Sequence, residues 1–172
     1  MFTSPRTRPP VVLVGCCTLV LGLWLGTVGA KRQAPQRPPL SPEQRDAFLA
    51  GRRNAVLATI KKDGSPQLTP VWYRWDGEQF WVSTTKQRAK YKNIVRDPRV
   101  SLCIDDAEHF TTVIASGRAR LTEDNLWADT QKIGERYRGP EQAAAQTKRM
   151  QEQHEPRVLV VLKPQQLISW GQ

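Results

Sequence analysis

Histidine and cysteine are scarce in this chain of 172 residues, which contains two histidines and three cysteines. Cys16 and Cys17 lie together in an uncharged N-terminal stretch, so Cys103 is the single cysteine of the remaining sequence. One cysteine cannot form an internal disulfide bond. Two histidines far apart in the sequence and one cysteine do not make a zinc site of ordinary composition, so we expect no metal centre.

The motifs of several common enzyme classes are also missing. The chain has no Gly-x-Gly-x-x-Gly after a strand, no Gly-Lys-Ser/Thr loop and no Gly-x-Ser-x-Gly, so it shows no sign of a Rossmann fold, a P-loop or a serine hydrolase. Asp105 and Asp106 stand in an expected turn, where solvated side chains are commoner than catalytic carboxylates. A chain with so few acid–base groups indicates that a cofactor performs the chemistry.

Negative charge is absent from the first 40 residues, which contain five basic residues and no Asp or Glu. The formal net charge of the whole chain is +10, so residues 41–172 carry a net charge of +5. This remaining charge favours anionic ligands. It is too small to indicate nucleic acid as a partner, and we expect none.

Residues 11–30 form a stretch without a charged side chain, flanked by Arg8 and Lys31. Its length fits a membrane-spanning helix, and its basic flank and small C-terminal residues also fit a signal peptide. We expect residues 1–40 to be an apolar leader with a proline-rich linker, and residues 41–172 to be the folded domain. The expected localisation is a membrane anchor with the domain in the cytoplasm. The alternatives are export, or a cytoplasmic protein if the leader is a gene-model artefact.

Beyond residue 40 the pattern is one of short strands with helices between them. Ser41-Pro42-Glu43-Gln44 has the residues of a helix start with a capping box, Asp63-Gly64 is a hairpin signal, and Pro70 indicates an edge strand or a bulge. Because most connections look like hairpins, we expect a mainly β (α+β) domain, an antiparallel barrel of six or seven strands with flanking helices. Strands are expected at 55–60, 66–75, 80–84, 99–105, 111–121 (broken at Ser116-Gly117), 157–162 and 166–170.

The segment 82–93 combines hydroxyl groups with cations at the expected start of a helix. Lys86 and Lys90 are four residues apart, as are Arg88 and Lys92, so a helix would align them in two neighbouring rows. The free N–H groups and the positive dipole end of that helix would lie beside them. This arrangement suits a phosphate or another multiply charged anion. A solvated basic helix face is the alternative.

Aromatic residues and a strand break lie nearby in the sequence. Trp72, Trp75 and Trp81 fall on adjacent expected hairpin strands, where core or interface positions are commoner than ligand stacking. The break at Thr69-Pro70-Val71 leaves backbone N–H and C=O groups without partners, and such groups can recognise the edge of a planar heterocycle.

Several motifs taken together resemble a known family. Their order and spacing over roughly residues 41–170 are similar to those of the pyridoxamine-phosphate-oxidase-like split-barrel superfamily, and more narrowly of its coenzyme F-420 (deazaflavin)-dependent oxidoreductase branch. The motifs are Ala55-Val56-Leu57-Ala58-Thr59-Ile60, Asp63-Gly64-Ser65-Pro66, Thr69-Pro70-Val71-Trp72, Ser83-Thr84-Thr85, Arg88-Ala89-Lys90 and Asp97-Pro98-Arg99-Val100-Ser101-Leu102.

The resemblance implies a six-stranded split β-barrel (FMN-binding-like) that forms a homodimer with cofactor sites at the subunit interface. It also implies hydride transfer between a deazaflavin and an unsaturated small-molecule substrate. By the same resemblance, the cofactor phosphate is held by Arg88 and Lys90 with help from Ser83, Thr84 and Thr85. Asn93 lines the site, Pro70, Val71 and Trp72 lie against the ring, and Lys86 and Lys92 suit the extra negative charge of the deazaflavin tail.

Two other functions are compatible with the sequence. The same fold can use FMN, as pyridoxamine-phosphate oxidases do, and a non-catalytic module could bind a flavin or a tetrapyrrole. The helical segment 123–156 either covers the substrate side or is a solvated excursion.

Overall fold

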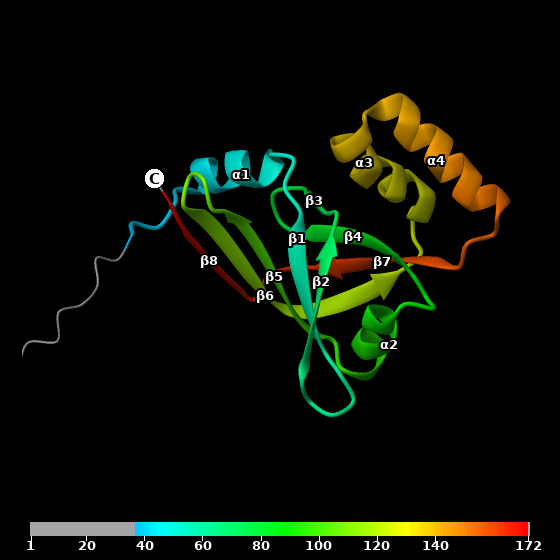
Figure 1. Ribbon diagram of the computed structural model, residues 1–172, viewed down its shortest axis with the longest axis horizontal. Coiled ribbons are helices and arrows are strands. Elements are labelled where there is room, and N and C mark those ends of the chain that lie inside the picture. The colour runs from blue at the N-terminus through cyan, green and yellow to red at the C-terminus, as the bar shows by residue number, and fades with distance from the viewer. Residues whose placement is uncertain (1–36, 172) are drawn as a thin grey trace, which may run out of the picture. The chain divides into compact units, whose positions relative to one another are not determined.

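The computed structural model describes residues 37–171, which form eight strands and four helices (Figure 1). The helices are α1 (Pro42–Ala50), α2 (Ala89–Arg96), α3 (Leu126–Arg138) and α4 (Pro140–Glu152). The strands are β1 (Ala55–Ile60), β2 (Pro66–Val71), β3 (Arg74–Trp75), β4 (Phe80–Thr85), β5 (Arg99–Asp106), β6 (Thr111–Thr122), β7 (Arg157–Leu162) and β8 (Gln166–Trp170).

Helix α1 begins as its sequence predicts. The Ser41 side chain accepts a hydrogen bond from the Gln44 backbone N–H, and the Gln44 side chain accepts one from the Ser41 backbone N–H. Pro42 occupies the first helical position, where its missing N–H has no intrahelical partner to lose. Phe48 and Leu49 then anchor the helix to the core.

The strands form an antiparallel sheet with the order β2–β1–β5–β6–β7–β4–β3, and β8 also pairs with β6. Strand β6 is shared along its length, because Thr111–Arg118 pairs with β5 and Ala119–Thr122 pairs with β7. The sheet curls around a core that includes Leu57, Phe80 and Leu102. The predicted mainly β split barrel with flanking helices is confirmed.

The described residues contain eight strands, whereas the resemblance implied six. The expected strand 66–75 is divided because Trp72 and Tyr73 leave the ladder between β2 and β3. Tyr73 instead enters the core, where its hydroxyl donates a hydrogen bond of 3.1 Å to the Leu49 carbonyl. Pro70 lies on β2 at the edge of the sheet, as its missing N–H requires.

The predicted break at Ser116-Gly117 is wrong, because β6 runs through both residues without interruption. Gly117 is required for a different reason. A Cβ at this position would lie 3.1 Å from Leu162 Cδ1 and 3.2 Å from the Gln165 backbone nitrogen. The same nitrogen donates a hydrogen bond of 2.9 Å to the Ser116 carbonyl, so the β7–β8 connection passes directly over β6.

We expect Gly117→Ala to lower the free energy of unfolding by about 1 to 3 kcal/mol, because the added methyl group meets backbone atoms that cannot rotate away. Urea denaturation of the full chain measures this change. Replacement of the exposed neighbour Arg118 by alanine is the control, and its expected effect is within about 0.5 kcal/mol. Equal stability of the two variants would contradict the close approach.

The expected membrane localisation is corrected by the structure. Within residues 37–171, no helix is long and apolar enough to cross a membrane. Residues 11–30, on which the expectation rested, lie outside the described residues, so no membrane anchor is proposed for this protein.

Candidate functional site

One hollow of about 370 Å³ brings together residues from distant parts of the sequence. Pro70 and Val71 end β2, and Trp72 directly follows it. Ser83 comes from β4, and Lys90 from the first turn of α2. Strands β2 and β4 are far apart in the strand order, so it is the curling of the sheet that makes them face one hollow. We call this hollow the β2–β4 pocket; its sixth lining residue is Asn54.

Lys90 supplies the positive charge of the β2–β4 pocket. Its side chain is half-buried, and within residues 37–171 it forms no ion pair. Burial lowers the pKa of Lys90 from the ordinary lysine value, and the positive charge of Arg88 lowers it further. A partly desolvated cation without a carboxylate partner attracts an anionic group into the pocket.

Ser83 is held by hydrogen bonds behind the pocket. Its Oγ lies 2.8 Å from Thr130 Oγ1 and accepts a hydrogen bond of 3.1 Å from Arg157 Nε. Arg157 in turn forms an ion pair of 2.8 Å with Glu155. Because Arg157 can only donate, the Ser83 proton is left for Thr130 or for a ligand in the pocket.

Trp72 is fixed from the outside by α3. Its ring is stacked on Tyr137 with a centroid distance of 4.6 Å and an interplanar angle of 4°, and Arg138 Cζ lies 5.1 Å from the ring centre. The Tyr137 hydroxyl donates a hydrogen bond of 2.8 Å to the Arg53 carbonyl and accepts one of 3.2 Å from the Tyr73 backbone N–H. Trp72 is thereby a rigid wall of the pocket, and the helical segment is what makes it rigid.

Comparison with known proteins agrees with the fold. Residues 41–171 match the family described as pyridoxamine 5′-phosphate oxidase. The chain belongs to the pyridoxamine 5′-phosphate oxidase family. The resemblance to the pyridoxamine-phosphate-oxidase-like superfamily, stated from the sequence motifs, is therefore confirmed.

Solved structures of similar proteins support this membership. A conserved hypothetical protein from Mycobacterium tuberculosis is 30% identical with a TM-score of 0.69, and the match covers 81% of this chain and 89% of that one. A protein named F420 reductase is 27% identical with a TM-score of 0.57, covering 71% and 94%. The general stress protein 26 of Bacillus anthracis is 19% identical with a TM-score of 0.57, covering 75% and 92%, which shows the fold alone.

The helix that was expected to carry Lys86, Arg88, Lys90 and Lys92 begins later than predicted. Helix α2 starts at Ala89, and Arg88 precedes it with extended backbone angles. Lys86 is drawn away by tertiary contacts, since its N–H donates to the Pro156 carbonyl and its amine pairs with Glu123 at 2.6 Å. The two aligned rows of cations are therefore not formed, and only Lys90 of the four lines the pocket.

The remaining predicted residues do not line the β2–β4 pocket. Asn93 is buried, and its amide donates hydrogen bonds to Thr59 Oγ1 at 3.1 Å and Gln67 Oε1 at 2.7 Å. Thr84 is buried on the core side of β4, whereas Thr69 and Thr85 are half-buried. Arg88 and Lys92 are exposed. The sequence did not point to Asn54, Thr130, Tyr137 or Arg157, because their contacts join segments far apart in the chain.

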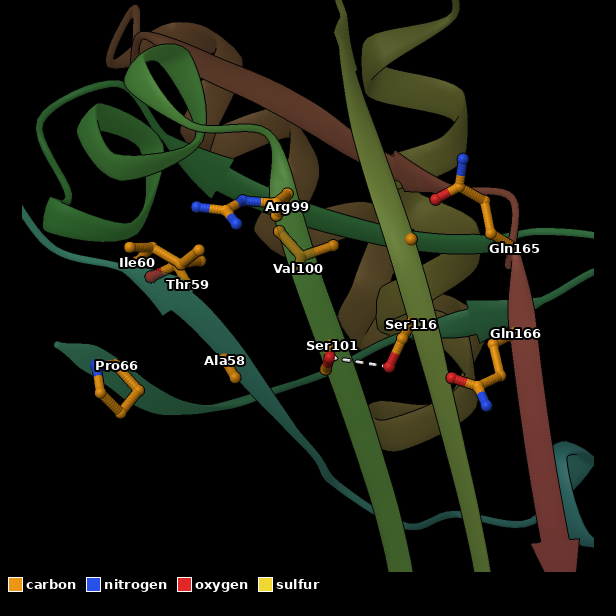
Figure 2. A pocket seen from close by; sticks show the side chains of 11 residues that line it. Ala58, Thr59, Ile60, Pro66, Arg99, Val100, Ser101, Ser116, Gln165 and Gln166 are labelled. Carbon is orange, nitrogen blue, oxygen red and sulfur yellow. Dashed lines mark hydrogen bonds between the residues drawn. The ribbon is translucent and has the colours of Figure 1, made fainter. Parts of the chain in front are cut away.

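A second hollow, of about 410 Å³, is lined by a different set of residues (Figure 2). Strands β1, β5 and β6 and the β7–β8 connection line it, and a hydrogen bond of 2.8 Å between Ser101 and Ser116 crosses its floor. None of the residues that were predicted to bind the cofactor lines this hollow.

Proposed function

We propose that this family member is an oxidoreductase that binds a phosphate-bearing deazaflavin, coenzyme F-420, in the β2–β4 pocket. The observation that carries the proposal is the meeting of Lys90 and Ser83 with the Pro70–Trp72 wall in one hollow. The cofactor would supply hydride transfer to or from an unsaturated organic substrate, and the residues of the chain would bind and orient it.

The residues of the pocket suit the two parts of such a cofactor. A phosphate is matched by the Lys90 amine, by the Ser83 hydroxyl and by the first two N–H groups of α2, which have no acceptor within the helix. A planar ring is matched by Pro70, Val71 and the fixed Trp72. The resemblance to the F-420-dependent branch and the likeness to the F420 reductase favour the deazaflavin, and FMN is the alternative.

Binding of the phosphate depends on the charge of Lys90, so we expect the affinity to fall at alkaline pH. A lysine is charged below its pKa, and the pKa of Lys90 is lowered, so its charge is lost at a lower pH than that of an ordinary lysine. Titrations of the full chain with the cofactor across the pH range about 7 to 10 measure this loss. Lys90→Arg keeps its charge throughout and is the control. An affinity with the same pH dependence in both proteins would contradict the role of Lys90.

An apolar row on the outer face of the sheet supports the proposed homodimer. Pro70, Val56, Cys103, Ile114 and Ile168 pair with one another in register across five strands. Val56 is 37% exposed and Ile168 is 44% exposed, so the row presents neighbouring apolar side chains on the surface of the sheet. The row ends at Pro70, a lining residue of the β2–β4 pocket, so a second copy on this face would reach the rim of the pocket.

We expect Val56→Glu to convert the dimer to a monomer, because it places a charge within the apolar row. Sedimentation of the full chain measures the mass. We expect the variant to lose cofactor affinity as it loses the dimer. Lys148→Glu introduces the same residue at an exposed position of α4 and is expected to stay dimeric. A monomeric parent protein, or a dimeric Val56→Glu variant, would contradict the proposed interface.

A turnover assay separates an enzyme from a non-catalytic binding module. Reduced deazaflavin or reduced FMN is mixed with the full chain and a panel of quinones, nitro-compounds and tetrapyrroles, and oxidation of the cofactor is followed by absorbance. Oxidation that depends on the protein supports the oxidoreductase. Tight cofactor binding with no oxidation above the protein-free rate for any acceptor would favour the binding module.

A further inference from the structure

The helical pair α3–α4 carries a second basic hollow, of about 360 Å³. Arg138 at the end of α3 lines it together with Gln142, Ala145, Gln146 and Arg149 of α4. These α4 residues lie three or four positions apart and so share one face of the helix. The neighbouring face carries Ala143 and Thr147, which are buried. We call this second basic hollow the α4 hollow.

The α4 hollow adjoins the β2–β4 pocket through a small cavity beneath the helices. Gln146 lines both the α4 hollow and this cavity of about 100 Å³. Trp72 and Ser83 line both the cavity and the β2–β4 pocket. Arg138 also links the α4 hollow to the β2–β4 pocket, since it lines the α4 hollow and its guanidinium group lies over the ring of Trp72, which lines the pocket. The three spaces therefore follow one another from Lys90 to Arg149.

Positive charge lines this series of spaces, and no acidic side chain does. Lys90, Arg138, Arg149 and Arg157 contribute to the lining, and of these only Arg157 has a carboxylate partner in the part of the chain that the structure describes. Cations that line a concave surface add to one positive electrostatic potential, which concentrates anions there. A helix face that is merely solvated has no need to carry basic residues without acidic ones.

We propose that Arg138 and Arg149 form a carboxylate-binding subsite for the substrate, which would be a planar organic acid. Its ring would lie beside Trp72 and its carboxylate in the α4 hollow. Arginine binds carboxylates through paired N–H groups, and the Gln142 and Gln146 amides add neutral donors. The inference rests on the proposed function, because it takes the cofactor ring to lie against the Pro70–Trp72 wall. Since the cofactor phosphate is expected at Lys90, the other end of the series is left for the substrate.

Two matched probes test the subsite in the full chain loaded with cofactor. Anthraquinone-2-carboxylate and anthraquinone-2-carboxamide have the same ring and nearly the same shape, and they differ in charge. Quenching of tryptophan fluorescence measures their binding. We expect the carboxylate to bind about tenfold more tightly than the carboxamide, and Arg138→Gln and Arg149→Gln each to reduce this preference severalfold. Lys148→Gln, an exposed α4 variant outside the hollow, is expected to keep it.

Equal binding of the two probes, or a preference that persists in both arginine variants, would overturn the subsite. A third arm compares the deazaflavin, which has a carboxylate-bearing tail, with FMN, which has none. If Arg149→Gln weakens the tailed cofactor alone and leaves the probe preference intact, the carboxylate belongs to the cofactor and the substrate assignment is wrong. The same titrations separate the two proposals. If the parent protein binds both probes equally but still binds the cofactor, only the subsite is refuted, and an arginine-dependent preference without cofactor binding refutes only the cofactor site.

Discussion

Replacement of both Arg88 and Lys90 by alanine is expected to weaken cofactor binding at least about 100-fold, because two cations are removed from the phosphate end of the β2–β4 pocket. Lys90 lines the pocket, and Arg88 lies close enough for its charge to lower the pKa of Lys90. In the described residues neither side chain forms an ion pair, so the double variant leaves no carboxylate without a partner. We therefore expect the fold to be unchanged.

Fluorescence titration gives the affinity of the double variant, and circular dichroism with thermal unfolding checks its fold. The matched control is Lys61→Ala with Lys62→Ala, which removes the same charge from the exposed turn after β1. If the control weakens binding as much as the pocket variant, the effect is one of net charge and the anion site is not where we place it. Unchanged binding by a folded double variant would refute the site directly.

Arg136→Met is expected to have the largest effect on stability, lowering the free energy of unfolding by about 3 kcal/mol. The Arg136 guanidinium donates hydrogen bonds to the Tyr73, Leu49 and Gly51 carbonyls at 2.7, 2.8 and 2.6 Å. It thereby ties α3 to α1 and to the segment between β2 and β3. Methionine fills similar space but removes three hydrogen bonds from a charged donor, each of which contributes more than a neutral hydrogen bond. The Leu49 and Gly51 carbonyls keep the Tyr73 hydroxyl and the Arg53 backbone N–H as donors, which limits the loss.

Urea denaturation measures the Arg136 effect. Lys148→Met, at an exposed α4 position, is the control and is expected to change stability by less than about 0.5 kcal/mol. Because Arg136 is next to Tyr137, which fixes Trp72, the Arg136→Met variant should also show altered tryptophan fluorescence at low urea. A variant as stable as the control would show that the three hydrogen bonds do not hold α3 in place.

Much of the fold could be predicted because its signals are local. The capping box of Ser41 and Gln44, the Asp63-Gly64 hairpin and the edge position of Pro70 each depend on neighbouring residues. The features that local signals missed depend on distant contacts. The Pro156 carbonyl and Glu123 hold Lys86 outside α2, and the β7–β8 connection makes Gly117 necessary within a continuous strand.

The candidate site shows the same division. Pro70, Val71, Trp72, Ser83 and Lys90 were recognisable by their chemical types and by the family resemblance, and the structure brings these five into one pocket. Asn93 has the spacing of a site residue, one turn after Lys90, but its amide is used in the core by Thr59 and Gln67. Arg157 and Tyr137 have no local signal, because they reach the pocket only through the curled sheet and the α3–α4 pair.

The most direct test of the proposed cofactor site is a fluorescence titration of the full chain with coenzyme F-420 and, separately, with FMN. We predict saturable binding of the deazaflavin with a dissociation constant of about 1 μM or below, and its loss in the Arg88→Ala/Lys90→Ala variant. Tighter binding of FMN would support the β2–β4 pocket as the cofactor site and identify FMN as the cofactor. Binding of neither by the folded protein would contradict the proposal, since the β2–β4 pocket would then not be a flavin or deazaflavin site.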